Sequence, residues 1–106
     1  MLIRQGDVLL VPVSEAPASQ PVPRRQGRLV LATGELSGHA HAVADEHAEL
    51  VTAEGASQLY LLVHGEPATL SHEEHTPLIV PPGTYRVVRQ REYDPVAAMA
   101  ERYAYD

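Results

Sequence analysis

All six histidines of this 106-residue chain fall between residues 39 and 75. Two of them form a His-x-His pair directly after Gly38, and two more bracket a pair of glutamates in the order His-Glu-Glu-His. Histidine is the commonest metal ligand in proteins and the side chain that titrates near neutral pH. The cluster therefore predicts a chemical site, although nothing in the sequence names a reaction. Its members are His39, His41, His47, His64, His72 and His75.

The pattern is typical of a site for a divalent transition metal. In a β-strand, side chains two residues apart point to the same face, so we expect His39 and His41 to aim in one direction. Two such imidazoles can bind one ion at the bond length of about 2.0–2.1 Å typical of zinc. Nitrogen and oxygen ligands suit Zn, Fe, Ni, Mn or Cu, and the sequence does not choose among these metals. The third and fourth ligands must come from elsewhere, and the candidates are Glu46, His47, His64, His72 and His75. The competing hypothesis is a polar face on which imidazoles hydrogen-bond one another and the nearby carboxylates.

The two glutamates between His72 and His75 are candidates for a catalytic role. If the protein is an enzyme whose metal acts as a Lewis acid or activates water or dioxygen, Glu73 or Glu74 is the general base. The flanking histidines are three residues apart and precede Thr76-Pro77, whereas the zinc-protease motif needs a spacing of four on a helix. We therefore expect a loop or single turn there, and no metalloprotease.

Arginines near the C-terminus are candidates for binding a ligand carboxylate or phosphate. Strand alternation places Arg89 on one face with Tyr85 and Val87, and Arg86 on the other. For Arg89 we favour the simpler interpretation of a solvated edge strand that its charges protect from aggregation. In a barrel, Arg86 would point toward the cavity.

Short apolar runs separated by turn residues predict an all-β fold. Asp45-Glu46 is expected to form a hairpin turn, and residues 14–26, with three prolines, an exposed loop. Asp94-Pro95 resembles a helix start, which predicts a short helix over residues 94–104. We thus expect a single domain over residues 1–106, a small β-barrel or sandwich of about seven to eight strands with one C-terminal helix. The expected strands are 7–13, 28–32, 39–44, 47–53, 58–63 (the most buried), 68–70, 77–81 and 84–90.

Residues 34–55, taken with residues 81–90, resemble the two sequence motifs of the cupin superfamily. The resemblance implies a small β-barrel whose first motif supplies His39, His41 and Glu46 to a metal. In the second motif, Pro81-Pro82-Gly83 matches the family's Pro-x-Gly turn, but Arg86 stands where the family has its third histidine and Gln90 where it has asparagine. The resemblance then implies that the last ligand is displaced, to His64, His72 or His75, or is missing.

Composition excludes several classes of function. With no Cys and no Lys, the chain has no disulfide, thiolate nucleophile or Schiff-base lysine. A net charge of -6 argues against binding to nucleic acid or anionic membranes, and the short apolar runs favour a cytoplasmic bacterial protein. A core without Phe or Trp leaves open a second hypothesis, a non-catalytic module of a bacterial operon that forms a homo-oligomer or binds a protein partner. A third is a pH-responsive histidine switch without metal.

Overall fold

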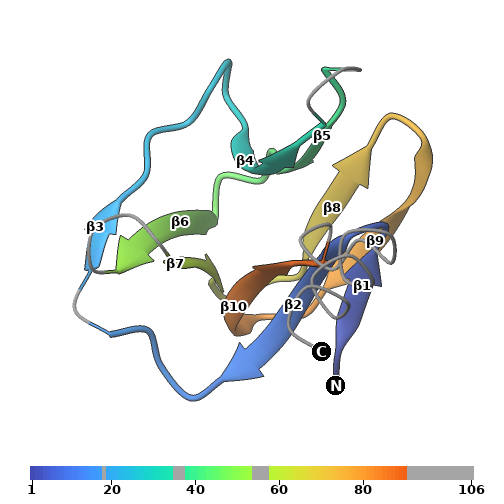
Figure 1. Cartoon of the computed structure of the whole chain (residues 1–106). Helices are drawn as coiled ribbons and strands as arrows, with labels where there is room; N and C mark the ends of the chain where they lie inside the picture. The colour runs from blue at the N-terminus through green and yellow to red at the C-terminus, as the bar shows by residue number, and fades with distance from the viewer. Residues whose placement is uncertain (18, 35–37, 54–57, 91–106) are drawn as a thin grey trace, which may run out of the picture.

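Ten strands form from the residues that this computed structural model describes, namely 1–17, 19–34, 38–53 and 58–90 (Figure 1). No helix long and apolar enough to cross a membrane occurs in these ranges. The helix predicted over residues 94–104 lies outside them. In chain order the strands are β1 (Ile3–Gln5), β2 (Val8–Val13), β3 (Ser19–Pro21), β4 (Leu29–Thr33), β5 (Ala40–Val43), β6 (Ala48–Ala53), β7 (Gln58–Val63), β8 (Ala68–His72), β9 (His75–Val80) and β10 (Gly83–Arg89).

Eight of these strands coincide with the predicted ones, because alternation of apolar and polar side chains marks a half-buried strand well. The two additional strands are short. β1 pairs with β2 across a two-residue turn at Gly6 and Asp7, and Gly6 has the positive φ of 58° that a type II′ turn needs at its first position. β3 lies inside the predicted exposed loop, and its three exposed residues pair with β6. The predicted number of strands was therefore too low.

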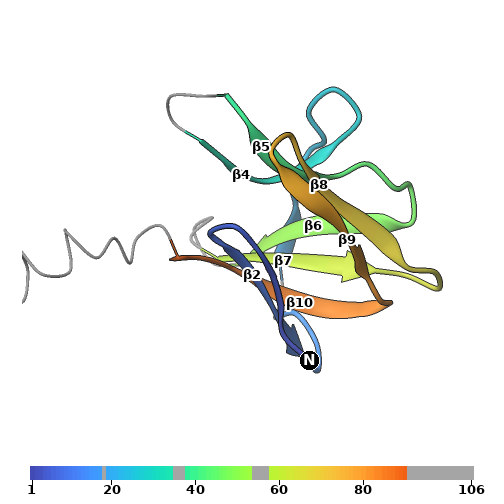
Figure 2. The ribbon, with the colours of Figure 1, turned by 90° about the vertical axis from the view of Figure 1, so that its right-hand side faces the viewer.

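All pairings are antiparallel and assemble two sheets, with strand orders β1-β2-β10-β7-β6-β3 and β4-β5-β8-β9. Figure 2 shows the four-stranded sheet lying over the six-stranded one, and one hydrophobic core lies between them. The sheets do not join into a closed barrel, so the sandwich alternative of the prediction is confirmed and the barrel alternative is wrong. Leu10, Leu50, Leu61, Leu70 and Tyr85 are the largest fully buried side chains.

The predicted hairpin turn at Asp45-Glu46 is also wrong, because the strands on its two sides belong to different sheets. β5 pairs with β4 and β8, whereas β6 pairs with β3 and β7. The segment is a crossover, and Arg24 holds it by donating hydrogen bonds to the carbonyl oxygens of Asp45 (2.7 Å) and Ala48 (2.9 Å). An interior place in the smaller sheet buries all four residues of β5.

The prediction that residues 58–63 form the most buried strand is therefore wrong, because β5 is buried more completely. In β7, only Leu61 and Val63 are buried, because one face of the larger sheet points away from the core. The same alternation explains why the predicted orientation of Arg86 is wrong. Tyr85 and Val87 of β10 are buried and Arg86 between them is exposed, so Arg86 does not point into the interior as a barrel would require.

Candidate metal centre

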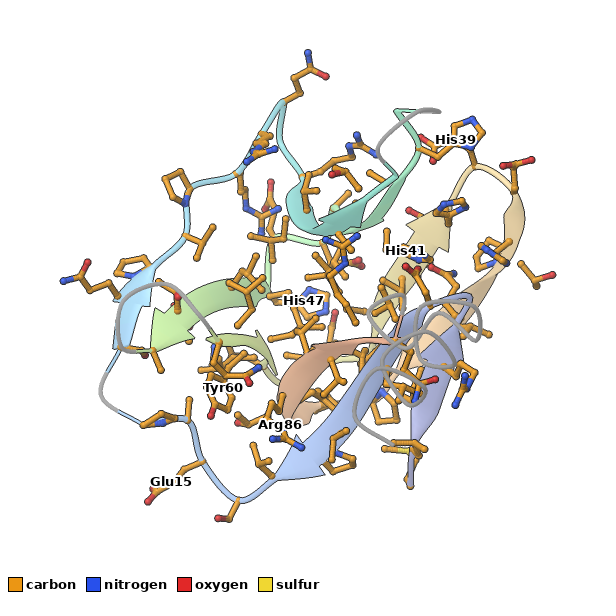
Figure 3. All side chains as sticks on the ribbon, viewed as in Figure 1. Glu15, His39, His41, His47, Tyr60 and Arg86 are labelled. Atoms are coloured by element: carbon orange, nitrogen blue, oxygen red, sulfur yellow. The ribbon has the colours of Figure 1, made fainter. Side chains whose placement is uncertain are left out.

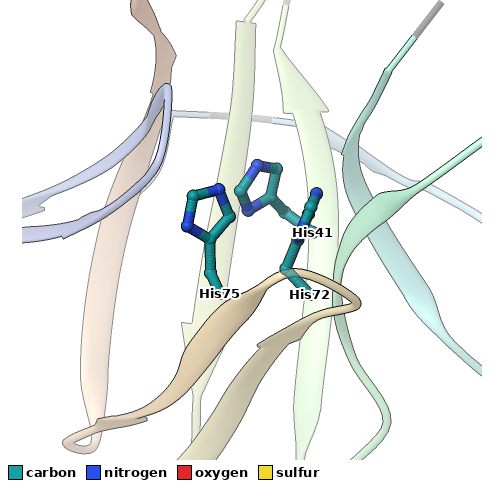
Figure 4. A group of neighbouring side chains, drawn as sticks. All are labelled: His41, His72 and His75. Atoms are coloured by element: carbon teal, nitrogen blue, oxygen red, sulfur yellow. The ribbon is translucent and has the colours of Figure 1, made fainter. Parts of the chain in front are cut away.

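Four of the six histidines meet at one end of the sandwich. His41 lies in β5, with His39 just before it, while His72 and His75 pair with each other at the ends of β8 and β9. Of the predicted loop or single turn, the structure has the turn: Glu73 and Glu74 connect the two strands of a β-hairpin. The ring centroids of His41 and His72 lie 4.3 Å apart, those of His72 and His75 4.6 Å, and those of His41 and His75 5.7 Å. In Figure 4, the hairpin presents His72 and His75 to His41, whose strand β5 pairs with β8.

Two sets of side chains have donor atoms that all lie within 4.8 Å of one another, which is close enough to hold a metal ion. One set is His41, His72 and His75, and the other is His39, His72 and Glu73. The predicted chelating pair is therefore divided, because His39 and His41 share His72 as a neighbour but belong to different sets. His39 precedes β5 and lies at the outer rim of the molecule, whereas His41 lies further inside (Figure 3).

The buried member of the first set is His41, whose side chain is 5 % exposed. Its Nδ1 lies 2.8 Å from Oε1 of Gln5, which is itself buried. The Gln5 amide nitrogen donates to the carbonyl oxygens of Leu70 (3.0 Å) and Thr76 (3.1 Å), so the amide oxygen must be the atom that faces His41. An amide oxygen only accepts hydrogen bonds, so Nδ1 of His41 carries a proton.

The other ring nitrogen of His41 also faces an oxygen. Its Nε2 lies 3.1 Å from Oδ1 of Asp7 in the β1–β2 turn. A neutral imidazole has one N–H, and Gln5 receives it, so the lone pair on Nε2 points at a carboxylate. Burial, followed by the nearby His72 ring, lowers the pKa of His41 below 6.5 despite the opposing effect of Asp7. The neutral ring therefore prevails near neutral pH, and a cation between Nε2 and Asp7 would relieve the repulsion.

Gly6 fits closely under the histidines. A Cβ at this position would lie 2.7 Å from Nε2 of His75 and 3.3 Å from Cε1 of His41. Real Cβ atoms essentially never show the first distance. The turn thus needs glycine for its positive φ and also because the His75 ring occupies the space of a side chain.

His72 is held less favourably for binding a metal. Its Nδ1 accepts a hydrogen bond of 3.0 Å from the backbone N–H of Glu74. The neutral ring then carries its proton on Nε2. A metal can bind Nδ1 of His72 only if the turn moves the Glu74 N–H away, and it can bind Nε2 only if the proton moves to Nδ1 and breaks the same hydrogen bond. His72 is therefore the ligand that must rearrange.

The two glutamates of the turn fasten the hairpin to the start of β5. Oε1 of Glu73 accepts a hydrogen bond of 2.9 Å from the Ala40 N–H, and Oε1 of Glu74 lies 2.8 Å from Nδ1 of His39. The bond from Ala40, followed by that from its own N–H, lowers the pKa of Glu73. A lower pKa makes a carboxylate a weaker base, so Glu73 is better suited to positioning the hairpin than to the predicted role of general base.

The remaining predicted ligands lie outside this cluster. His47 Nε2 donates to the Pro67 carbonyl oxygen (2.9 Å), and the exposed His64 pairs with Glu49 at 2.6 Å. Glu46 is exposed in the crossover and belongs to neither set of donors found among the described residues. Arg86 and Arg89 lie on β10, on opposite faces of the sheet.

Gln5, Gly6 and Asp7 were not predicted to belong to the site. Gly-Asp between two apolar stretches is a hairpin signal that could have identified the turn. No sequence signal could have shown that this turn meets histidines more than 30 residues further along the chain, since that contact depends on how the two sheets pack.

Comparison with known proteins places the chain in a family without assigning an activity. A model of a domain of unknown function, DUF8820, matches residues 4–90. Comparisons with curated proteins and with solved structures return no match. The matched segment contains every residue of the cluster described above, and because it spans most of the chain, this protein belongs to the DUF8820 family.

Proposed function

We propose that the protein binds one divalent transition-metal ion through His41, His72 and His75, with the Asp7 carboxylate as a further ligand. The observation that carries this proposal is the environment of His41. Its Nδ1 proton is directed to Gln5, and its Nε2 lone pair lies 3.1 Å from a carboxylate oxygen. Metal-binding histidines generally donate their second ring N–H to an oxygen that fixes the tautomer, which is the role of Gln5 here.

The distances fit an ion after the rings close, and Asp7, which belongs to neither set of donors, must approach His72 and His75 as well. A tetrahedral zinc site with bonds of about 2.0–2.1 Å separates neighbouring donor atoms by about 3.3 Å. His41 and Asp7 are already near that separation, at 3.1 Å. The three histidine donors lie within 4.8 Å of one another and must approach by up to about 1.5 Å. Rotation of His72 and of the exposed His75 supplies this movement.

Three imidazoles and a carboxylate suit Zn, Fe, Ni or Mn. This donor set retains the chemistry that a cupin-like protein would use, while Asp7 replaces Glu46 as the carboxylate. An enzyme would need an open position on the metal, whereas four protein ligands would favour a structural ion. The proposal is therefore metal binding, with no reaction assigned.

The test is metal analysis of tag-free protein before and after treatment with a chelator. We expect near one equivalent of metal per chain, restored by adding back Zn, Fe, Ni or Mn and accompanied by a rise in the melting temperature. The His41→Ala/His75→Ala variant should lose both. A protein that takes up none of these metals, or a variant that retains the full equivalent, would refute the proposal.

A second candidate function is self-association through the sheet edges. Met1 and Leu2, beside β1, are 71 % and 58 % exposed, and Ile79 on β9 is 65 % exposed. Both strands end their sheets, where unpaired backbone groups favour pairing with another chain. Light scattering tests this candidate. A dimer that Ile79→Asp converts to a monomer would support it, and a monomeric wild-type protein would exclude it.

A further inference from the structure

A second site lies between β4 of the smaller sheet and β7 and β10 of the larger one, and no histidine lines it. It consists of two adjoining hollows, each of about 310 Å³, that share Leu31, Leu59 and Arg89 in their walls. This volume falls at the lower end of the range for small-molecule sites, about 300–1,000 Å³. Val87 lines the first hollow, and Val22 the second. Apolar side chains therefore make up about half of the walls. Arg86 also lines the first hollow, and Arg89 lies where the two hollows meet.

Two polar atoms beside the second hollow are buried without a hydrogen-bond partner, namely Oγ1 of Thr52 and Nε of Arg89. Leaving a buried polar group unpaired costs free energy, so such groups in a native protein call for an explanation. A ligand oxygen seated between them could pair with both, provided that the lining side chains move aside. An oxygen that only accepts hydrogen bonds suits Arg89, and the Thr52 hydroxyl can donate to it as well.

The charge of the site favours an anion. Arg89 reaches from β10 to the other sheet, where its Nη2 donates to the Thr33 carbonyl oxygen at 3.0 Å. Arg25 is the second cation in the lining of the second hollow. Within the described residues, neither guanidinium forms an ion pair with a carboxylate. Two uncompensated cations in a chain of net charge -6 mark a local preference for negative charge.

We infer that the space between the sheets binds a small organic anion with an apolar body, its carboxylate or phosphate group held by Arg89, Arg25 and Thr52 and its carbon chain lying against Leu31, Leu59 and Val22. This inference does not rest on the metal proposal, because none of the four proposed ligands lines either hollow. The two sites are nevertheless close in the fold. Ala32, which lines the second hollow, pairs with His41 in the ladder between β4 and β5.

The inference is tested by isothermal titration calorimetry of the chelator-treated, full-length chain with four probes. The probes are hexanoate, hexyl phosphate, their neutral analogue hexanamide, and inorganic phosphate. We expect at least one of the two hexyl anions to bind about tenfold or more tightly than hexanamide, because charge-assisted hydrogen bonds are the strong ones. The same anion should bind more tightly than inorganic phosphate, because the apolar wall contributes. A preference between the hexyl anions identifies the head group.

Thr52→Val is the most informative variant, because it removes the unpaired hydroxyl and keeps the shape of the side chain. We expect it to raise the melting temperature of the free protein and to weaken binding of the hexyl anion severalfold. Arg25→Gln should also weaken binding, whereas Arg4→Gln, an exposed arginine that lines neither hollow, should not. The inference is overturned if no hexyl anion binds, if hexanamide or inorganic phosphate binds equally well, or if Thr52→Val binds like the wild type.

Discussion

Two pairs of histidines lie at the ends of neighbouring antiparallel strands in this protein, yet only one pair belongs to a candidate site. His72 and His75 pair across the β8–β9 hairpin. His47 and His64 flank the paired ends of β6 and β7, where the His64 N–H donates to the His47 carbonyl oxygen at 3.0 Å. Similar positions on strands thus give different environments.

The difference comes from what each pair faces. His72 and His75 meet His41 from β5, beside the β1–β2 turn with Asp7. His47 and His64 each have a separate partner, the Pro67 carbonyl oxygen and the Glu49 carboxylate. A histidine pair on adjacent strands is therefore not a metal site by itself. We propose that it becomes one where a third strand and a turn bring a buried imidazole and a carboxylate to it.

The largest expected effect separates the two pairs directly. His41→Ala/His75→Ala should lower zinc affinity by more than about 100-fold, since even the partners of metal ligands commonly contribute 10–100-fold. His47→Ala/His64→Ala should change the affinity by less than about twofold, because distant sites act independently. Competition titrations with a chromophoric chelator measure both variants. Equal losses in the two variants would remove the distinction between the pairs.

The next effect concerns the turn beneath the histidines. Gly6→Ala places a Cβ 2.7 Å from Nε2 of His75 at a φ of 58°, so it should lower both stability and zinc affinity. The backbone strain alone is worth about 1–2 kcal/mol. Gly65→Ala is the matched control, because Gly65 has a φ of 75° with nothing within 4 Å of the added Cβ.

Chemical denaturation and zinc titration of both glycine variants separate strain from crowding. We expect Gly65→Ala to lose only the stability that the backbone strain costs and to keep its zinc affinity. Gly6→Ala should lose more stability than this and should also lose zinc affinity. If the two variants behave alike, the contact between the turn and His75 has no part in the site.

A smaller loss of zinc affinity should follow when the hydrogen bond that fixes the tautomer of His41 is removed. Gln5→Met removes the oxygen that receives the Nδ1 proton and should weaken zinc binding by about 10–100-fold. Gln58→Met is the control, since Gln58 also donates two hydrogen bonds to backbone carbonyl oxygens, of Leu59 and Val87, but contacts no histidine. Both variants should lose some stability, and only Gln5→Met should lose zinc affinity. Unchanged affinity in Gln5→Met would mean that Gln5 serves the fold alone.

The smallest expected effect is a pH dependence of the metal-free protein. Burial lowers the pKa of His41 below its ordinary 6.5, so near that pH the folded state binds fewer protons than the unfolded state. The contribution of His41 is then fully present above pH 6.5 and is lost as the pH falls below it, with a slope of at most about 1.4 kcal/mol per pH unit for one proton. Urea denaturation between pH 5 and 8 should show this decline, and His41→Gln should flatten it. A wild-type stability that rises on acidification would contradict the sign.

The sequence was sufficient to predict most strands but not their assembly. The apolar alternation of residues 58–63 or 84–90 depends only on which side chains face the core, and β7 and β10 form there. Whether β5 and β6 form a hairpin depends on competition between distant strands, so the turn at Asp45 was misassigned. Pro-rich β3 has no alternation to detect.

For the site, the sequence identified the side chains that can bind metal but not the subset that meets. The sequence offered His72 and His75 only as alternative candidates, and the β8–β9 hairpin brings them together through its tight turn. The sequence also paired His39 with His41, whereas the structure places them in different sets of donors, with His39 before the start of β5. Gln5 and Asp7 carry no chemical signal in isolation and acquire their roles from the packing of β1 against β9.

The most direct test of the account is nuclear magnetic resonance of the histidine ring nitrogens during a zinc titration. We predict that before zinc is added the proton of His41 resides on Nδ1. At one equivalent of zinc, a nitrogen of each of His41, His72 and His75 should show a metal-bound shift, on Nε2 in His41, while His47 and His64 stay unchanged. Unshifted rings in the first group, or equal shifts of His47 and His64, would contradict a metal centre built by β5, the β8–β9 hairpin and the β1–β2 turn.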